Sequence, residues 1–183
     1  MITPAPGILL IADPFLKDPN FLRTVVFLCE HREEGSVGFV LNRKLDKTLD
    51  ELLEDMEGVK LPVYYGGPVQ MDTIHFLHQY PDEIPGSFKV TDEIYWGGEM
   101  EKVITLIKQG EIDTGKIRFY IGYSGWSDGQ LTEELNEKTW LTVQAICKLV
   151  FHENDNDIWK ESIKHLGGDY EIMVNFPIDP QLN

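Results

Sequence analysis

The 183-residue sequence has little cysteine, no secretion signal and no long apolar run. Its two cysteines, Cys29 and Cys147, each lie within an apolar segment, which favours buried free thiols in a reducing compartment over a disulfide framework. No N-terminal basic stretch precedes an apolar segment with a cleavage site. No apolar run approaches the roughly 20 residues that are needed to cross a bilayer. We therefore expect a cytoplasmic protein that has no membrane partner.

Basic residues are also scarce, because 16 lysines and arginines stand against 31 aspartates and glutamates, and the formal net charge is −15. A duplex backbone repels such a molecule, and non-specific nucleic-acid binding depends on cationic side chains at phosphates. The nearest basic group, Arg43, Lys44 and Lys47, is followed at once by an acidic run between positions 50 and 57. The sequence therefore argues against nucleic acid as a partner, while solubility alone accounts for the charge.

Length and composition are those of one globular domain, which we place at residues 1–183. Apolar residues make up 42% of the chain and charged residues 26%, values that exclude a collagen, a long disordered region or a coiled coil. Area scaling predicts that about 70% of the surface is buried on folding, so the core needs no disulfide or structural metal. No internal repeat, low-complexity tract or linker divides the chain.

Short apolar runs separated by turn residues predict many strands and few helices. Strands are expected at 7–12, 24–30, 36–41, 62–65, 73–78, 88–90, 94–96, 116–123 and 140–146, with 172–176 as a last strand or an ordered tail. Helices are expected at 49–56, at 99–109, after Ser127, and after Asp155 as far as Leu166. Capping boxes at Thr48 and Ser127 and a capping side chain at Asp155 predict three of the helix starts. Because strands outnumber helices and do not alternate with them, the predicted class is α+β.

The densest group of candidate functional residues is GYSGWSDGQLTEEL at 122–135. A strand end, a Gly125-Trp126 turn and a capped helix N-terminus coincide there, and free backbone N–H groups at such a junction can hold an anion. The alternative is structural: Ser127 and Gln130 cap the helix while Trp126 packs in the core, which is the commoner arrangement. The segment is not a phosphate-binding loop, which needs a Lys-Ser/Thr pair. It is not a nucleophile elbow either, because Trp126 stands where that motif needs glycine.

Cysteine and histidine residues offer a possible nucleophile but no metal site. Cys29 and His31 lie two residues apart and could pair as nucleophile and base, although isolated Cys and His residues are usually structural. His75 and His78 are separated by an odd number of positions, so they cannot share one face of a strand. We therefore expect no metal ion.

Two further pairs end predicted strands and have a structural and a functional interpretation. Asn42 and Arg43 could orient a carboxylate or phosphate, or they could form a strand-end turn and a surface ion pair. Gly66 and Gly67 are expected to form a turn that requires positive φ.

Several segments, taken in order, resemble the AlgH/YqgE family of bacterial proteins. They are GILLIADP at 7–14, NFLRTVVFLCEH at 20–31, GSVGFVLNR at 35–43, YYGGPV at 64–69, FLH at 76–78 and GYSGWSDGQLTEEL at 122–135. No single segment is specific, but the ordered set covers essentially the whole chain. The residues at recurrent positions of the family are Asn42, Arg43, Gly66, Gly67, Pro68, Gly122, Gly125, Trp126, Gly129, Gln130, Leu131 and Glu134.

The resemblance implies a single α+β domain whose branched, mostly antiparallel β-sheet curls toward a pseudo-barrel and is flanked by a few helices. It also implies a cytosolic location, but it implies no reaction and no cofactor. Relatives are often labelled transcriptional regulators, a label inherited from a genetic effect on alginate production. We expect the candidate residues to line one recess, formed by Asn42, Arg43, Gly66, Gly67, Tyr123, Trp126, Gln130 and Glu134.

Three functions remain open. A cytosolic ligand- or protein-binding domain with a regulatory role ranks first, because the sequence holds no complete catalytic set, and its partner is an unidentified small molecule or protein. The alternative is a hydrolase-like enzyme acting on a small polar substrate, with candidate residues Asn42, Arg43, His31, Gln130 and Glu134. A DNA-binding regulator ranks third, because the chain is acidic and has no helix-turn-helix with a basic recognition helix.

Overall fold

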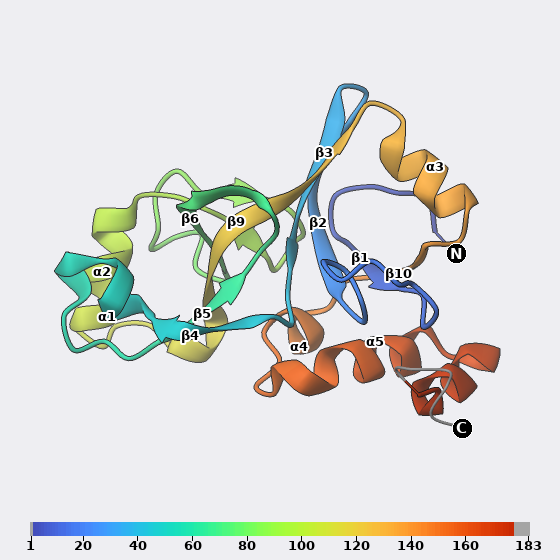
Figure 1. The fold of residues 1–183 in the computed structure, drawn as a ribbon. Helices are drawn as coiled ribbons and strands as arrows, with labels where there is room; N and C mark the ends of the chain where they lie inside the picture. The colour runs from blue at the N-terminus through green and yellow to red at the C-terminus, as the bar shows by residue number, and fades with distance from the viewer. Residues whose placement is uncertain (1, 178–183) are drawn as a thin grey trace.

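The computed structural model describes residues 2–177, and Figure 1 shows their arrangement. The strands are β1 (Ile8–Ala12), β2 (Val25–Arg32), β3 (Gly35–Val40), β4 (Lys44–Thr48), β5 (Pro62–Tyr65), β6 (Val69–His78), β7 (Phe88–Lys89), β8 (Tyr95–Trp96), β9 (Ile117–Ser127) and β10 (Trp140–Gln144). The α-helices are α1 (Leu49–Leu52), α2 (Met100–Lys108), α3 (Gln130–Asn136), α4 (Cys147–Val150) and α5 (Ile158–Leu166). Segments of 3-10 helix lie at Glu54–Met56, Thr114–Lys116, Asp155–Asp157 and Gly168–Asn175.

The sheet is branched at β9. Its order is β10-β1-β2-β3-β9-β6-β8-β7, and β5 pairs with β9 and β4 outside this path. Residues 119–121 of β9 pair in parallel with β5, whereas residues 124–127 pair antiparallel with β3. The sheet does not close into a barrel, because β10 and β7 lie at opposite ends of the strand order. The predicted α+β class with a branched, mostly antiparallel sheet is confirmed, and the curl stops short of closure.

Helices cover both faces of the β1 end of the sheet, with α5 on one side and α3 on the other (Figure 1). Leu9 and Ile11 face the cluster beneath α5, while Leu10 and Ala12 face the cluster that includes α3. All five residues of β1 are buried, because a strand covered on both faces has no solvent side. A third apolar cluster lies where α1 and α2 pack against β5, β6 and β9.

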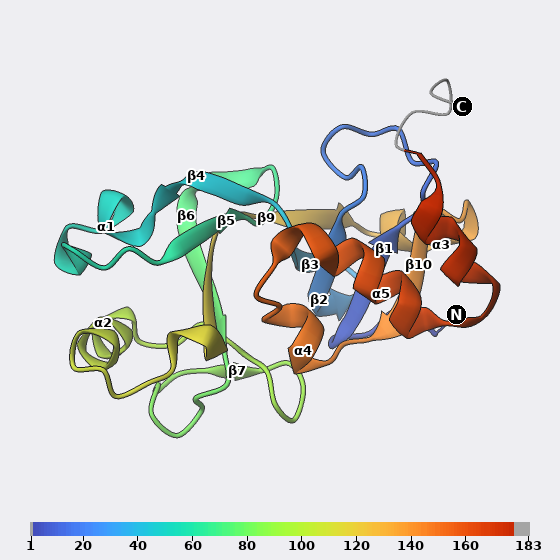
Figure 2. The same cartoon turned by 90° about the horizontal axis from the view of Figure 1, so that it is seen from below.

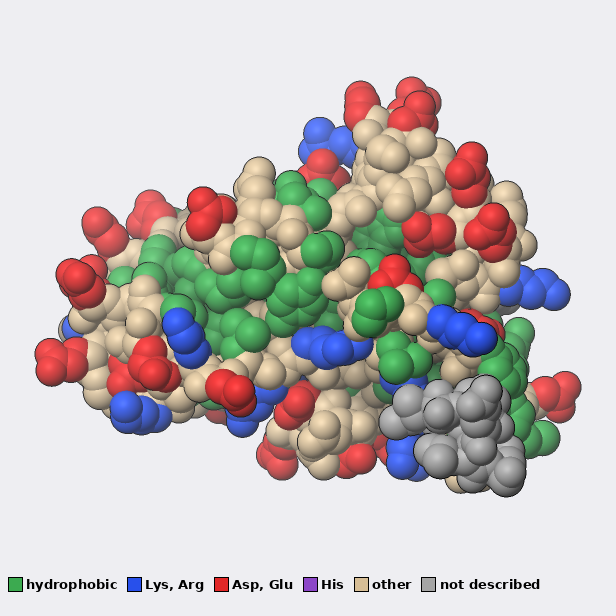
Figure 3. Space-filling model, in the orientation of Figure 1, with side chains coloured by type: hydrophobic (Ala, Val, Ile, Leu, Met, Phe, Trp, Pro, Cys, Tyr) green, Lys and Arg blue, Asp and Glu red, His purple; other side chains and the backbone are tan. Residues whose placement is uncertain are grey.

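The surface is acidic around its edges. Figure 3 shows Asp and Glu side chains spread around one face of the molecule and apolar side chains gathered over β5, β6 and β9. None of the helices within residues 2–177 has both the length and the apolar character that crossing a membrane requires.

The region after β3 differs from the predicted pattern. β4 was not predicted, because its sequence KLDKT lacks apolar alternation. Among the strands of residues 2–177 it pairs with β5 alone, and charged residues suit such an edge strand. The helix expected at 49–56 is divided into α1 and a 3-10 segment, with Leu53 extended between them. The capping box is confirmed, since the Thr48 N–H donates to the Glu51 carboxylate at 2.8 Å.

Two predicted helix caps and one possible strand are wrong. β9 continues through Ser127, and α3 begins at Gln130 behind Gly129, whose φ of +73° makes the tight turn from strand to helix. The Asn154 side chain caps the 3-10 segment that precedes α5, so Asp155 is not the cap. Residues 172–175 form 3-10 helix that packs against α5 instead of joining the sheet as a strand.

Candidate functional site

Asn42 and Arg43 hold the segment that leads into β2. The Asn42 amide accepts a hydrogen bond from the Val25 N–H at 3.0 Å and donates one to the Arg23 carbonyl at 2.9 Å. The Arg43 guanidinium donates to the carbonyls of Pro19 and Leu22 at 3.3 and 3.0 Å. The described hydrogen bonds of both side chains therefore go to the chain's own backbone, which accounts for the pair without a ligand.

Gly66 and Gly67 form the branch point of the sheet. The Gly66 N–H donates to the Ile121 carbonyl at 2.8 Å, and its carbonyl accepts from the Val40 N–H at 2.8 Å. A Cβ on Gly66 would lie 2.4 Å from the Gly122 carbonyl oxygen, and one on Gly67 would lie 2.2 Å from the Tyr123 carbonyl. Two backbones touch here, so close approach requires glycine at both positions.

Trp126 belongs to a hydrogen-bonded network with Gln130 and Glu134. One oxygen of the Glu134 carboxylate accepts from the indole N–H groups of Trp126 and Trp140, at 2.9 and 2.7 Å. The other oxygen accepts from the Gln130 amide at 3.0 Å, and the Gln130 oxygen accepts from the Ser127 N–H at 3.0 Å. The network joins α3 to β9 and β10, the strands that precede and follow it in the sequence.

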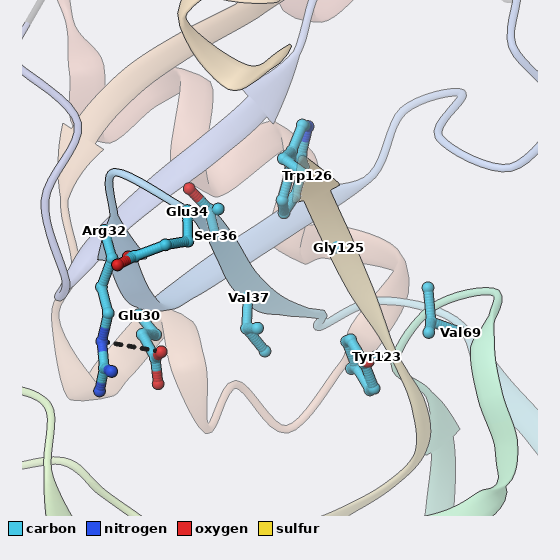
Figure 4. Close-up of a pocket in the computed structure, with 10 residues that line it drawn as sticks. Glu30, Arg32, Glu34, Ser36, Val37, Val69, Tyr123, Gly125 and Trp126 are labelled. Atoms are coloured by element: carbon cyan, nitrogen blue, oxygen red, sulfur yellow. Dashed lines mark ion pairs between the residues drawn. The ribbon is translucent and has the colours of Figure 1, made fainter. Parts of the chain in front are cut away.

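A surface cavity of about 540 Å³ lies where β2, β3, β6 and β9 meet, and we call it the β3–β9 groove (Figure 4). Its lining residues are Glu30, Arg32, Glu34, Gly35, Ser36, Val37, Val69, Tyr123, Gly125 and Trp126. Of the predicted site residues, the structure brings Tyr123 and Trp126 to this cavity. It places Asn42, Arg43, Gly66, Gly67, Gln130 and Glu134 outside the lining of the groove.

The floor of the groove is a row of residues that crosses three strands. The strand register aligns Glu30, Val37 and Gly125, and Figure 4 shows Glu30, Val37 and Tyr123 pointing to one side of the sheet and Trp126 to the other. A Cβ on Gly125 would lie 3.5 Å from the Tyr123 ring and 3.7 Å from the Val69 side chain, which is ordinary contact. Because Gly125 also lacks positive φ, the fold would accept a side chain there. Glycine at this position leaves the floor of the groove open.

Charges line one end of the groove. Arg32 and Glu30 form an ion pair of 3.0 Å, in which the side chains are 64% and 29% exposed. Glu34 lines the same cavity, so two carboxylates and one guanidinium belong to its lining. The groove thus combines an aromatic ring and two valines with an acidic end.

The Cys29 and His31 side chains do not form a nucleophile–base pair. The Cys29 thiol is fully buried, donates weakly to the Phe27 carbonyl at 3.8 Å, and has a pKa that burial holds well above its usual value. The His31 Nδ1 bonds instead to the Ser36 hydroxyl at 2.7 Å. A buried, protonated thiol of this kind is not a reactive nucleophile.

His75 and His78 occupy different environments. His78 is completely buried, its Nδ1 accepts from the Tyr80 N–H at 3.0 Å, and its Nε2 bonds to the Gly97 carbonyl at 2.9 Å. His75 lies against the rings of Phe39, Trp96 and Tyr123. Within residues 2–177, no three His, Cys, Asp or Glu side chains gather in a way that could hold a metal ion.

Sequence reasoning missed most residues of the groove. The available signal lies in β2, where VVFLCEHR changes from apolar to charged at Glu30. That change marks the point at which the strand extends beyond its apolar covering. The alignment of Glu30 with Val37 and Gly125 depends on pairing between distant strands, and a bulge in β2 between Leu28 and Glu30 shifts the register.

Comparison with known proteins shows similarity along nearly the whole chain. An AlgH-like family model matches residues 9–171. A UPF0301 protein of Chlorobium limicola is 42% identical over 178 residues, covering 97% of this chain and 95% of the relative. A UPF0301 protein of Cytophaga hutchinsonii is 38% identical over 178 residues, covering 97% of this chain and 98% of the relative. The names of these relatives state no reaction or ligand.

Two solved structures share the fold. The solution structure of the AlgH protein from Pseudomonas aeruginosa matches with a TM-score of 0.73 and 30% identity, covering 97% of this chain and 98% of that one. A crystal structure of a Corynebacterium diphtheriae protein matches with a TM-score of 0.79 and 20% identity, covering 96% and 94%, which supports the fold alone. The family match and the sequence identities show that the chain belongs to the AlgH-like family.

Proposed function

We propose that the protein is a cytoplasmic binding domain with a regulatory rather than catalytic role, and that its ligand occupies the β3–β9 groove. The observation that carries this proposal is the open floor at Gly125, where the fold has room for a side chain and has none. A cavity of about 540 Å³ is within the range of small-molecule sites. Aromatic and apolar walls with a few charged groups are typical of such sites.

The lining selects a flat ligand that is positively charged or neutral. Tyr123 supplies an aromatic surface beside Val37 and Val69, and the carboxylates of Glu30 and Glu34 outnumber the single guanidinium of Arg32. A cation near an aromatic face and carboxylates is attracted by both. The net charge of −15 adds a long-range attraction for cations. An aromatic amine, or a basic side chain of a partner protein, has this chemistry.

The enzyme alternative has less support. It needs Asn42, Arg43, His31, Gln130 and Glu134 to converge on one substrate. Glu134 instead holds two indoles, and Arg43 donates to backbone carbonyls at the other end of β3. The DNA-binding alternative is no better supported than the enzyme alternative, because the negative charge of the chain opposes contacts with phosphate groups.

Three probes that share one ring and differ in charge test the proposal: benzylamine, benzyl alcohol and benzoate. We expect benzylamine to shift the backbone amide resonances of Val37 and Gly125 in ¹H–¹⁵N NMR spectra, benzyl alcohol to shift them less, and benzoate least. Gly125→Val fills the floor and should abolish the shifts. Ser127→Val, on the same strand but outside the lining, is the matched control.

Two results would contradict the proposal. One is benzylamine shifts that persist unchanged in a folded Gly125→Val variant. The other is equal responses to all three probes, which would show that the groove has no preference for a cation. Thermal unfolding of each variant confirms that the comparison is made between folded proteins.

A further inference from the structure

A second cavity lies between the β4–β5–β9 part of the sheet and the segment that follows α4. The elements that contribute its lining residues are labelled in Figure 2. Its volume is about 440 Å³, and we call it the β5–α4 cleft. The lining residues that matter here are Lys44, Lys116, Arg118, Pro62, Phe151 and Glu153. None of the residues predicted to form the site lies among them.

Strand register and the 3-10 segment before β9 bring three basic residues to this cleft. Lys44 pairs with Tyr64, and Tyr64 pairs with Tyr120. Arg118 precedes Tyr120 by two positions, so it projects from the same face of β9. Lys116 ends the 3-10 segment that leads into this strand, and it lines the same cleft. Lys44, Lys116 and Arg118 therefore line one cleft, although Lys44 lies more than 70 positions earlier in the chain.

Arg118 is held in place by neutral partners. Its guanidinium lies 4.5 Å from the centre of the Tyr64 ring and donates to the carbonyls of Val150 and His152 at 3.4 and 2.6 Å. Within residues 2–177, no carboxylate lies within 4.0 Å of its nitrogens. The guanidinium is thus pre-oriented at the cleft, and its positive charge is not neutralised by a direct ion pair.

The local charge of the cleft is opposite to that of the whole chain. Among the residues 2–177, Lys44 and Lys116 also form no ion pair. Two carboxylates, Asp113 and Glu153, share the lining, so three positive charges less two negative charges leave an excess of one. One oxygen of Asp113 already accepts a hydrogen bond from the Gly115 N–H at 2.8 Å. A positive cleft on a chain of net charge −15 needs an explanation.

We propose that the β5–α4 cleft binds a small organic anion that carries a carboxylate or phosphate group on a flat apolar body. Lys44, Lys116 and Arg118 meet the oxyanion, because guanidinium and ammonium groups form strong charge-assisted hydrogen bonds with such oxygens. Pro62 and Phe151 form the apolar wall that covers the body of the ligand. This site is separate from the β3–β9 groove and does not depend on the function proposed for it.

The test uses phenyl phosphate, benzoate and inorganic phosphate as anionic probes and benzylamine as the cationic control. We expect phenyl phosphate or benzoate to shift the backbone amides of Arg118 and Phe151 in NMR titrations and benzylamine to leave them unchanged. The stronger of the two aromatic anions identifies the preferred head group. Inorganic phosphate should bind more weakly, because it lacks a body to cover the apolar wall.

The double variant Lys44→Gln/Lys116→Gln removes two charges whose described contacts include no structural hydrogen bond. We expect it to weaken binding of the aromatic anion at least tenfold, since the loss of even one of the two charge contacts costs on the order of a factor of ten. Lys47→Gln, on the same edge strand but outside the cleft, is the matched control. The absence of any shift at Arg118 and Phe151, equal affinity in the double variant, or equal response to benzylamine would overturn the proposal.

Discussion

Replacing Glu134 with alanine tests the account of the tryptophan network most directly. The carboxylate accepts hydrogen bonds from the indoles of Trp126 and Trp140 at 2.9 and 2.7 Å. Trp126 is 5% exposed and Trp140 is 1% exposed, so water has little access to either ring. The variant Glu134→Ala therefore removes the only described acceptor of two indole N–H groups in residues 2–177.

The magnitude follows from the number and kind of the lost hydrogen bonds. A hydrogen bond to a charged group contributes about 1.5–3 kcal/mol to stability. Two such bonds set an upper range of about 3–6 kcal/mol. Glu134 itself is partly exposed, so water can replace some of the lost contact, and we expect a loss of about 3 kcal/mol in the free energy of unfolding.

The conservative variant Glu134→Gln separates charge from geometry. Its amide oxygen can still accept from both indoles, but its amide nitrogen would face the Gln130 amide nitrogen, which now donates at 3.0 Å. Gln130 must then turn its amide and lose its bond to the Ser127 N–H. We expect a smaller loss for this variant, of about 1–2 kcal/mol.

Urea unfolding followed by tryptophan fluorescence measures both variants. Glu133→Ala is the matched control, because Glu133 is an exposed residue of the same helix, and its loss should change stability by no more than about 0.5 kcal/mol. A Glu134→Ala variant as stable as Glu133→Ala would refute the view that the carboxylate joins α3 to the sheet.

Three further predictions concern buried groups. Among the described residues 2–177 the buried Tyr120 hydroxyl has no hydrogen-bond partner, so Tyr120→Phe should leave the free energy of unfolding unchanged or raise it by up to about 1 kcal/mol, and a clear loss in urea unfolding would reveal an unrecognised bond. Burial lowers the pKa of His75 and His78, so the unfolded chain binds more protons than the folded one once the pH falls below about 6.5. Stability should be complete above that pH and decrease below it by up to about 1.4 kcal/mol per pH unit for each imidazole, whereas a flat profile from pH 7 to 5 would contradict this. A Cβ on Gly67 would overlap the Tyr123 carbonyl, so Gly67→Ala should cost more than about 3 kcal/mol by thermal or urea unfolding, far beyond Gly58→Ala, where nothing lies within 4 Å.

Apolar runs and capping boxes in the sequence correctly predict those strands and helices whose position depends on residues close together in the chain. The continuous apolar run at 7–12 predicts a buried strand, which β1 confirms, and the capping box at Thr48 starts a helix because its two hydrogen bonds lie within one turn. The structural interpretation of Trp126 as a core residue is confirmed, because its side chain is buried in an apolar cluster. Its bond to Glu134 and the contribution of Trp140 depend on tertiary packing, which spacing along the chain does not reveal.

The branch of the sheet and the groove depend on contacts between distant residues. Gly66 must be glycine because of the Gly122 carbonyl, more than 50 positions away. Local reasoning predicts only a turn at that place. The polar strand β4 is likewise stable because β5 supplies its partner, although its own residues have little preference for a strand. The sequence therefore indicates that these glycines are important, but it does not reveal the backbone contact that requires each of them.

Late synthesis of β9 has a consequence for how the protein is made. β3 and β5 leave the ribosome well before residues 117–127. Until β9 has been made, the strand edges of β3 and β5 that pair with it have backbone N–H and C=O groups without a partner. Unpaired strand edges in an incomplete chain favour aggregation. We expect newly made chains to engage a chaperone until residue 127 has emerged, and fragments that stop before residue 117 to remain unfolded.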